Sequence, residues 1–369
     1  MVNPFTKNNY TLPLASINHV KLIILKDELS KLGIYNKSAY QVFSSKEIIN
    51  ELKLYTSQLN LSNYKDHELL ILANKILSEN NLEKIALIKK ISKKYGEVLG
   101  YIFHSLKNDT FKNRQTRFDW HDRHWSFWKT INKIFISGGI LNGNFGNLLL
   151  KSTKKLLLDN KIVDLKIFKA TDTQEIGLLG SSLFIKENSP YNMVFDFGQT
   201  FIKRGIANFE NNILQYVDIL PKKKSLYTNC ENFSDLDSKL LNEYIINTIL
   251  DTYKNATYPK ESLGNEISIS FANNILDKKL SNSGGYAKLN LIANNYENYL
   301  SNKVSQILNY KFKINLIHDG TAIAANFHNN KTINSVSISS GTAFSIGFPN
   351  EVKIYKKSKT NSKNFVKIT

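Results

Sequence analysis

Two carboxylates in this sequence stand where apolar runs end, a position at which folded chains often expose reactive side chains. Asp196 follows the run Met193–Phe195, and Asp319 follows the run Ile314–His318. A carboxylate at a strand end beside a cleft can accept the proton of a substrate hydroxyl group. A carboxylate beside phosphates can hold Mg²⁺ through water, because magnesium keeps most of its hydration. The alternatives are structural: an ordinary hairpin around Asp196, and a helix cap at Asp319.

Three short turns rich in glycine also follow apolar runs. They are Gly198–Thr200, Gly341–Thr342 and Gly138–Gly139. The first two turns each separate two apolar runs, at 193–207 and 335–347, and so predict tight β-hairpins. Backbone N–H groups in such turns can hold phosphate oxygens. The third turn precedes a predicted helix, whose N-terminus suits the same ligand, but its glycine spacing is not that of a dinucleotide-binding fingerprint.

The elements that must position these turns follow from hydrophobic periodicity. Residues 1–110 are predicted to be mainly helical, with a helix start at Ser44 and Glu47, which have capping-box spacing. A long helix is predicted from Glu83 to Ile102, in which Gly96 and Gly100 share one side and allow a close neighbour, unless the two glycines coincide by chance. Further helices are predicted at 148–158, 234–257 and 291–309, and further strands at 133–136, 165–168, 214–220 and 266–271.

Composition is that of a globular protein with room for two lobes. The chain has 369 residues, 42% of them hydrophobic, and a formal net charge of +18. Because lysine is spread along the whole chain, we expect a small anionic ligand such as a nucleotide rather than nucleic acid. The single cysteine, Cys230, excludes an internal disulfide and favours a cytoplasmic location. No run of 18 apolar residues occurs, so neither a signal peptide nor a membrane span is expected.

Residues 111–129 gather all three tryptophans together with His121, Asp122 and His124. A metal site or a base-stacking surface are two hypotheses for such a segment. The third, which we favour, is an aromatic segment that packs against the adjoining lobe.

Together these segments resemble the ATP-binding fold shared by sugar kinases, actin and heat-shock chaperone ATPases, and most closely the ROK family of sugar kinases and repressors. The first phosphate motif of that family, D-x-G-G-T-x-x-K, is similar to Asp196, Gly198, Thr200 and Lys203, with Gln199 in place of the second glycine. The Asn-Asp that ends a later strand resembles His318-Asp319. The second phosphate motif resembles Gly341-Thr342, the adenosine motif resembles Gly138-Gly139, and the closing motif resembles the stretch from Asp172 to Ser182.

The motifs occur in a cyclically shifted order, since the last two family motifs precede the first three. The resemblance therefore implies an α/β protein with a two-lobed actin-like ATPase (ribonuclease H-like) fold that is circularly permuted and has a helical N-terminal region. Residues 1–188 and 332–369 would form the second lobe, including the aromatic insertion 111–129. Residues 189–331 would form the first lobe.

The resemblance implies an ATP-dependent kinase that phosphorylates a hydroxyl group of a sugar or related polyol, with ATP and Mg²⁺ as cofactors. Asp319 would be the catalytic base, and Asp196 would orient the magnesium ion. The residues expected to bind ATP are Asp196, Gly198, Gln199, Thr200, Lys203, Gly341, Thr342, Gly138 and Gly139. The residues expected to bind the sugar are Asn273, Asn274, Gly285 and His318, some of them in a polar loop that closes on the ligand. A homodimer is a further expectation.

Two departures from the family pattern support a second hypothesis. Gln199 is bulkier than the glycine it replaces, and His318 replaces an amide that would contact the sugar. A regulatory protein that binds the nucleotide or the sugar without turnover is therefore the alternative function. A nucleic-acid-associated protein and an actin-like filament protein are further hypotheses.

Overall fold

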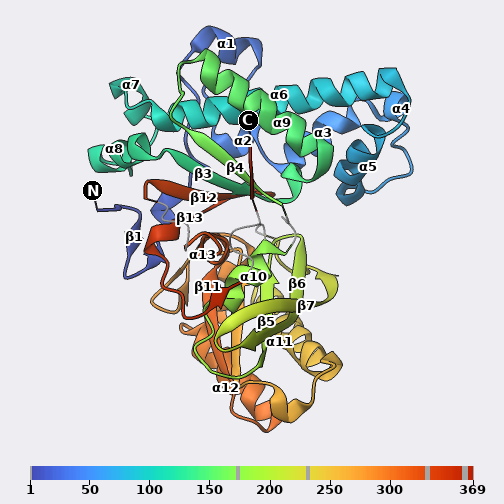
Figure 1. Ribbon diagram of the computed structural model, residues 1–369, viewed down its shortest axis with the longest axis vertical. Coiled ribbons are helices and arrows are strands. Elements are labelled where there is room, and N and C mark those ends of the chain that lie inside the picture. Colours follow the sequence, from blue (N-terminus) through green and yellow to red (C-terminus); the bar gives the residue numbers. More distant parts are fainter. Residues whose placement is uncertain (1, 172–174, 230–232, 329–332, 360–364, 369) are drawn as a thin grey trace.

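The computed structural model describes residues 2–171, 175–229, 233–328, 333–359 and 365–368, and Cys230 and Asp172 lie outside these ranges. The protein is a mixed α/β structure in which two sheets lie one above the other (Figure 1). Within the described residues, one sheet has six strands in the order β11-β8-β5-β6-β7-β14, here called sheet I. The other has five strands in the order β13-β12-β3-β4-β15, here called sheet II.

Sheet I begins with the hairpin that the turn Gly198–Thr200 predicts. Strands β5 (Tyr191–Phe197), β6 (Phe201–Glu210) and β7 (Ile213–Lys224) are antiparallel, whereas β8 (Glu266–Phe271) and β11 (Lys313–His318) run parallel to β5. Helix α11 (Asp235–Asn255) connects β7 to β8, and α12 (Tyr296–Leu308) connects β8 to β11. Both helices bury apolar residues against the sheet, in one cluster with β5 and β8. The parallel strands therefore bring Asp196 and Asp319 to the same edge of the sheet.

Sheet II contains the second predicted hairpin, formed by β12 (Ser335–Ser340) and β13 (Phe344–Gly347). Strand β3 (Lys133–Ser137) runs parallel to β12, and β4 (Lys166–Ala170) runs parallel to β3. Strand β15 (Phe365–Lys367) is antiparallel to β4. The parallel pair β12–β3 places the turns after both strands at one edge of this sheet.

Helices α6 (Leu82–Lys107) and α9 (Gly143–Asp159) pack against each other beside sheet II. The close approach predicted at the two glycines of α6 is confirmed. A Cβ atom on Gly96 would lie 2.3 Å from Leu149 O, and one on Gly100 would lie 2.9 Å from Leu156 Cδ2. Hydrogen in place of a side chain is what allows the two helices to touch along their backbones.

The predicted helical character of the N-terminal region is confirmed. Ser44 caps α3 and accepts a hydrogen bond from the Glu47 backbone N–H at 3.2 Å. The short elements of this region and of the aromatic segment are β1 (Thr6–Lys7), β2 (Tyr10–Thr11), η1 (Pro13–Ala15), α1 (Lys26–Lys31), α2 (Ala39–Val42), α3 (Ser45–Lys53), α4 (Thr56–Leu59), η2 (Asp66–Glu68), α5 (Leu69–Ile76), α7 (Phe111–Arg114) and α8 (Asp122–Thr130).

The aromatic segment 111–129 packs into the core beside sheet II, and the base-stacking hypothesis is wrong. Trp120, Trp125 and Trp128 are all buried, and Phe5 lies among them with ring centroids 5.1 Å from Trp120. The three proposed metal ligands do not converge. Asp122 is exposed and pairs with Arg114, while His124 Nδ1 accepts a hydrogen bond from the His121 backbone N–H.

Two helices, α10 (Ile176–Ser182) and α13 (Asp319–Ala325), cross between the sheets (Figure 1). Gly180 allows this crossing, because a Cβ atom there would lie 1.8 Å from Ala322 O. An apolar cluster formed by residues of sheet II and of the two helices fills one side of the junction; it contains Phe135, Ala170, Ile176, Ile323 and Phe327. A second cluster, which includes Leu178, Val194 and Ala322, joins the same two helices to sheet I. The sheets are therefore held together by direct helix contact.

Two segments differ from the sequence-based expectation. Strand β14 (Lys357–Ser358) falls in the range assigned to the second lobe, yet it pairs with β7 and so extends sheet I. The predicted mobile loop around residues 273–287 is instead ordered as β9 (Ile275–Leu276), β10 (Lys279–Leu280) and η5 (Gly285–Leu291). Its apolar side chains, among them Tyr286 and Leu289, are fully buried, and this burial outweighs the polar composition of the segment.

The last described element with helical geometry is η6 (Pro349–Glu351), which follows sheet II. No helix among the described residues combines the length and apolar character needed to cross a membrane.

Candidate functional site

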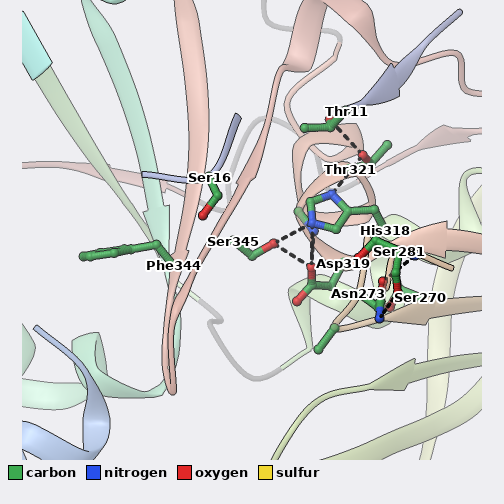
Figure 2. Close-up of polar contacts among 12 residues, drawn as sticks. Thr11, Ser16, Ser270, Asn273, Ser281, His318, Asp319, Thr321, Phe344 and Ser345 are labelled. Atoms are coloured by element: carbon green, nitrogen blue, oxygen red, sulfur yellow. Dashed lines mark hydrogen bonds and ion pairs between the residues drawn. The ribbon is translucent and has the colours of Figure 1, made fainter. Parts of the chain in front are cut away.

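Asp319 lies at the point where β11 ends and α13 begins, and one oxygen of its carboxylate collects several contacts (Figure 2). Oδ1 accepts hydrogen bonds from Ser345 Oγ at 2.5 Å and from the Gly320 backbone N–H at 2.8 Å. His318 Nε2 lies 3.2 Å from the same oxygen. Within the described part of the chain, every contact recorded for this carboxylate involves Oδ1. The Asp319 side chain is 20% exposed, which leaves the carboxylate accessible for a ligand.

His318 continues this network away from Asp319. Its Nε2 atom is 3.2 Å from Ser345 Oγ, and its Nδ1 atom is 3.4 Å from Thr321 Oγ1. Thr321 Oγ1 is in turn 3.1 Å from Thr11 Oγ1 on strand β2. Figure 2 shows this row of side chains running from β2 to the carboxylate of Asp319. The residues come from three parts of the chain: the N-terminus, β11 with α13, and β13.

Burial and charge act in opposite directions on this pair. Burial raises the pKa of Asp319, and repulsion from Asp196 raises it further, whereas His318 and the Ser345 hydroxyl lower it. Burial lowers the pKa of His318, and the neighbouring Asp319 opposes that change. The net result is a carboxyl group that binds its proton more tightly than usual, beside an imidazole that binds its proton less tightly than usual, and such a carboxylate can act as a general base.

Serine, histidine and aspartate occur together here, but they do not form a hydrolase triad. In a triad, the serine and the aspartate bind opposite nitrogens of the imidazole, so that the histidine relays a proton. At this site both Ser345 and Asp319 face the same nitrogen, His318 Nε2. Ser345 donates directly to Asp319 as well. The arrangement positions a carboxylate and does not activate a serine nucleophile.

Asp196 lies near the carboxyl end of β5, which is separated by β8 from β11, the strand that leads to Asp319. Its Oδ2 atom pairs with Lys203 Nζ at 2.8 Å, and its Oδ1 atom accepts a hydrogen bond from Ser270 Oγ at 3.0 Å. Helix α10 closes over it, since a Cβ atom on Gly177 would lie 2.3 Å from Asp196 Oδ2. Because β5, β8 and β11 run parallel, both carboxylates lie at the carboxyl ends of these strands. The structure therefore places the Asp196–Lys203 pair and Asp319 at the same end of sheet I.

The hairpin turn after Asp196 is held from several sides. Gly198 O accepts hydrogen bonds from Ser225 Oγ at 2.7 Å and Tyr286 OH at 2.8 Å. Gln199 does not project freely, because its Nε2 atom donates to Ala272 O at 3.2 Å. Thr200 is exposed at the tip of the turn. The Gly198 N–H closes the turn by donating to Phe201 O, so the expectation that this N–H is free for a phosphate is wrong.

The two glycine turns of sheet II meet. Gly138 has φ +116°, and a Cβ atom there would lie 1.9 Å from Ser340 O, the residue before Gly341. By contrast, a Cβ atom on Gly139 or Gly341 would meet no atom within 4 Å. Thr342 is exposed beside Gly341. Two open backbone surfaces therefore lie side by side at the carboxyl ends of β3 and β12, as a flat ligand or a phosphate requires.

A surface cavity of about 330 Å³ lies at α2 and α3, and the sequence analysis did not predict it. Residues of α2, α3 and their flanks line it: Lys37, Tyr40, Gln41, Ser44, Lys46 and Glu47. The Ser45 backbone N–H donates to Gly341 O at 2.8 Å, which joins the cavity wall to the turn. The volume is in the range of small-molecule sites.

The expected sugar-binding residues are not all available for a ligand. The Asn273 side chain binds the backbone of Ser281 and Ser283, and so uses both its amide and its carbonyl to order the following loop. Gly285 packs against Thr228, where a Cβ atom would lie 1.9 Å from Thr228 O. Both residues therefore serve the order and packing of this segment, and their assignment to substrate contacts stays a prediction. Asn274 is half-buried beside them.

His318 lies at the site, but it contacts protein side chains, as described above. Ser345 and Thr11, which complete its surroundings, were missed in the sequence. The one signal for Ser345 was its place in the predicted hairpin 335–347, since its partner Asp319 lies 26 residues away. Thr11 offered no signal, because it is 310 residues from Thr321.

No protein-family model, no curated protein and no solved structure matches this chain. The function must therefore be argued from the geometry of the site.

Proposed function

We propose that this protein is an ATP-dependent phosphotransferase that phosphorylates a hydroxyl group of a sugar or related polyol. The observation that carries the proposal is the carboxylate of Asp319, which is fixed through one oxygen, has a raised pKa, and lies in the same region as Asp196 and the turn Gly198–Thr200. A base and a phosphate-binding turn side by side are what phosphoryl transfer to a hydroxyl group requires.

The strand order supports a circularly permuted actin-like ATPase fold. Sheet I has an antiparallel hairpin followed by parallel strands in the order β7-β6-β5-β8-β11, with α11 and α12 as connections. Sheet II repeats part of that order as β13-β12-β3-β4, and α10 and α13 follow the last parallel strand of each sheet. Such a repeat, with ligands at the carboxyl ends of the strands, fits two lobes around a nucleotide. Here the chain enters in the middle of the second lobe.

The residues have definite roles under this proposal. Asp319 accepts the proton of the substrate hydroxyl group while its oxygen forms a bond to the γ-phosphorus of ATP. The bond between that phosphorus and the β,γ-bridging oxygen breaks, and ADP leaves with the electron pair. The Gly198 and Gly341 N–H groups donate within their own turns, so the other N–H groups of the turns Gly198–Thr200 and Gly341–Thr342 bind phosphate oxygens, and Gly138–Gly139 supports the adenosine.

Asp196 fits a magnesium site of the kind that ATP brings with it. It supplies one buried carboxylate, and Lys203 and Ser270 fix its orientation. One carboxylate together with nucleotide phosphates is a usual ligand set for Mg²⁺. The ion would supply neutralisation of phosphate charge. Lys203, which pairs with Asp196, is half-buried and supplies a second positive charge at the same place.

The test is ADP release from Mg-ATP in the presence of hexoses, N-acetylated amino sugars and other polyols. One of them should stimulate turnover, and Asp319→Asn should lower kcat by about 10²–10⁴-fold, the usual contribution of a general base. ATP binding by calorimetry should be unchanged in this isosteric variant. Stimulation that survives in Asp319→Asn would refute the role of the carboxylate, and absence of nucleotide binding by the natural protein would refute the fold-based part of the proposal.

A regulatory protein that binds the nucleotide or the sugar without turnover is the second candidate. The tied side chain of Gln199 favours it, because the amide occupies the turn where the resemblance expects a glycine. Tight binding of ATP or a sugar without ADP release from any polyol would select this function over the first.

A further inference from the structure

We infer that strand β2, at the N-terminus, belongs to the apparatus that positions the carboxylate of Asp319. Thr11 acts through Thr321 and His318, and holds the imidazole in the tautomer that donates Nε2–H to that carboxylate. The catalytic consequence rests on the proposed function, whereas the hydrogen-bonded arrangement does not. The structure assigns this role to a residue far from every phosphate-binding or base-like motif in the sequence.

The first argument is the burial of the row. Thr11 is 4% exposed, Thr321 is 6% exposed and His318 is 8% exposed. Water competes little with hydrogen bonds between such groups, and a polar atom left without a partner there costs more than one at the surface. Each side chain in the row is therefore more stable with its hydrogen bond to the neighbouring side chain than without a partner.

The second argument is the direction that chemistry imposes on the row. An ionised carboxylate only accepts hydrogen bonds, so the neighbourhood of Asp319 Oδ1 and Ser345 Oγ favours a proton on His318 Nε2. The neutral imidazole then has its lone pair on Nδ1, which requires a donor, and the hydroxyl group of Thr321 is 3.4 Å away. Because the Thr321 hydroxyl group donates its hydrogen to His318, its oxygen accepts a hydrogen bond from the Thr11 hydroxyl group, with the two oxygens 3.1 Å apart. Thr11 is thus the first donor in the row.

The third argument is that the N-terminal segment forms hydrogen bonds with both elements that meet at Asp319, α13 and β13. Thr11 holds α13, and Asn18 holds β13 through two hydrogen bonds with the backbone of Phe344, each 2.9 Å long. Phe344 precedes Ser345, the second donor to Asp319. Figure 2 shows Ser345 between Phe344 and the row that runs from Thr11 to Asp319. The segment therefore spaces the two elements that meet at Asp319.

The position of β2 is itself fixed. Strands β1 and β2 form a tight ribbon in which Thr6 pairs with Thr11, and Asn8 and Asn9 adopt positive φ at the turn. Phe5, directly before the ribbon, is fully buried among the tryptophans of the aromatic segment. Thr11 is therefore carried by an anchored element.

The experiment compares Thr11→Val, which removes the hydroxyl group at equal size, with Thr11→Ser, which retains it. Protein labelled with ¹⁵N-histidine reports the tautomer of each imidazole by NMR, and the His318 signals are identified by their loss in His318→Gln among the seven histidines of the chain. The natural protein and Thr11→Ser should show the Nε2–H tautomer at His318. Thr11→Val should shift the ring nitrogens toward a mixture with the Nδ1–H tautomer.

Thr6→Val, on the same ribbon, is the matched control and should leave the His318 signals unchanged. Thermal unfolding identifies any variant that fails to fold, and Thr321→Val then replaces Thr11→Val as the test of the same row. Unchanged His318 signals in folded Thr11→Val or Thr321→Val would overturn the inference.

Turnover provides the second measurement. In Thr11→Val, kcat should fall about fivefold, the usual effect of losing one neutral hydrogen bond, with KM for ATP unchanged and activity restored in Thr11→Ser. A tautomer change with unchanged kcat would overturn the catalytic part of the inference. If the natural protein has no phosphotransferase activity at all, the proposed function fails, and the NMR result still decides the arrangement.

Discussion

Asp319 shows at the scale of one residue how a site is made at the expense of stability. Burial raises the pKa of its carboxyl group above the ordinary value of 3.8, although His318 and Ser345 oppose this. The folded state therefore binds this proton more tightly than the unfolded state does, and ionisation of the carboxyl group disfavours folding. A carboxylate kept in such a place is typical of function.

The first prediction concerns Asp319→Asn. Below the ordinary carboxyl pKa the variant and the natural protein should be equally stable, because both are neutral there. As pH rises through the raised pKa, the natural protein should lose stability relative to the variant, which should unfold at a temperature about 1–3 °C higher at pH 7. Thermal unfolding between pH 4 and pH 8 checks this. If the unfolding temperature of the variant minus that of the natural protein falls between pH 4 and pH 7, the prediction is wrong.

The second prediction concerns Ser345→Ala, which removes a donor that lowers the pKa of Asp319. If Asp319 must be ionised to act as the base, the acid limb of the kcat profile should move to higher pH in this variant. Ser345→Thr retains the hydroxyl group and should behave as the natural protein does. An acid limb that does not move in Ser345→Ala would exclude Asp319 as the group that titrates.

At the scale of elements, glycines divide into two kinds. Gly96 and Gly100 of α6 and Gly180 of α10 are sites of contact between helices, while Gly139 and Gly341 face open space. The first kind serves packing. The second kind leaves backbone accessible at a strand end, which packing alone does not require.

The third prediction uses this difference. Gly96→Ala should lower the free energy of unfolding by about 1–3 kcal/mol, because its Cβ atom would lie 2.3 Å from Leu149 O. Gly139→Ala should change stability by less than about 0.5 kcal/mol, and should weaken ATP binding if adenosine packs against it. Urea unfolding and calorimetry of ATP binding measure the two effects. Equal destabilisation by both substitutions would remove the distinction.

At the scale of the whole molecule, α10 and α13 determine how the sheets lie relative to each other. After sheet II the chain forms α10 and then a short segment that leads to β5 and is hydrogen-bonded to sheet I. There Glu266 Oε2 accepts hydrogen bonds from the backbone N–H groups of Lys186 at 2.6 Å and Glu187 at 2.9 Å. The contact between α10 and α13, together with these hydrogen bonds, joins the two sheets.

The fourth prediction is that Gly180→Ala loosens this body. Its Cβ atom would lie 1.8 Å from Ala322 O, so α10 and α13 must separate, at a cost on the order of 2 kcal/mol. The unfolding temperature should fall, and small-angle scattering should show a larger radius of gyration. An unchanged unfolding temperature together with unchanged scattering would mean that the crossing does not set the spacing of the sheets.

Features that depend on neighbours in the chain were predictable from the sequence. The turn Gly198–Thr200 between apolar runs predicts the β5–β6 hairpin, and the run before Asp319 predicts that β11 ends there. Ser44 starts α3 through a hydrogen bond to a residue three positions on. These elements follow from local propensity, turn chemistry and hydrophobic periodicity, which act over a few residues.

Features that depend on strand order were decided only by the tertiary structure. The contacts of Asp319 with Ser345 and of Thr321 with Thr11, and the burial of residues 285–289, come from elements that are distant in sequence. Asn273 is polar and near a strand end, as a ligand-binding residue would be, yet the following loop uses its amide. Residue type and spacing determine which chemistry a side chain offers. The group that each side chain contacts depends on packing between elements, and no local sequence pattern encodes that packing.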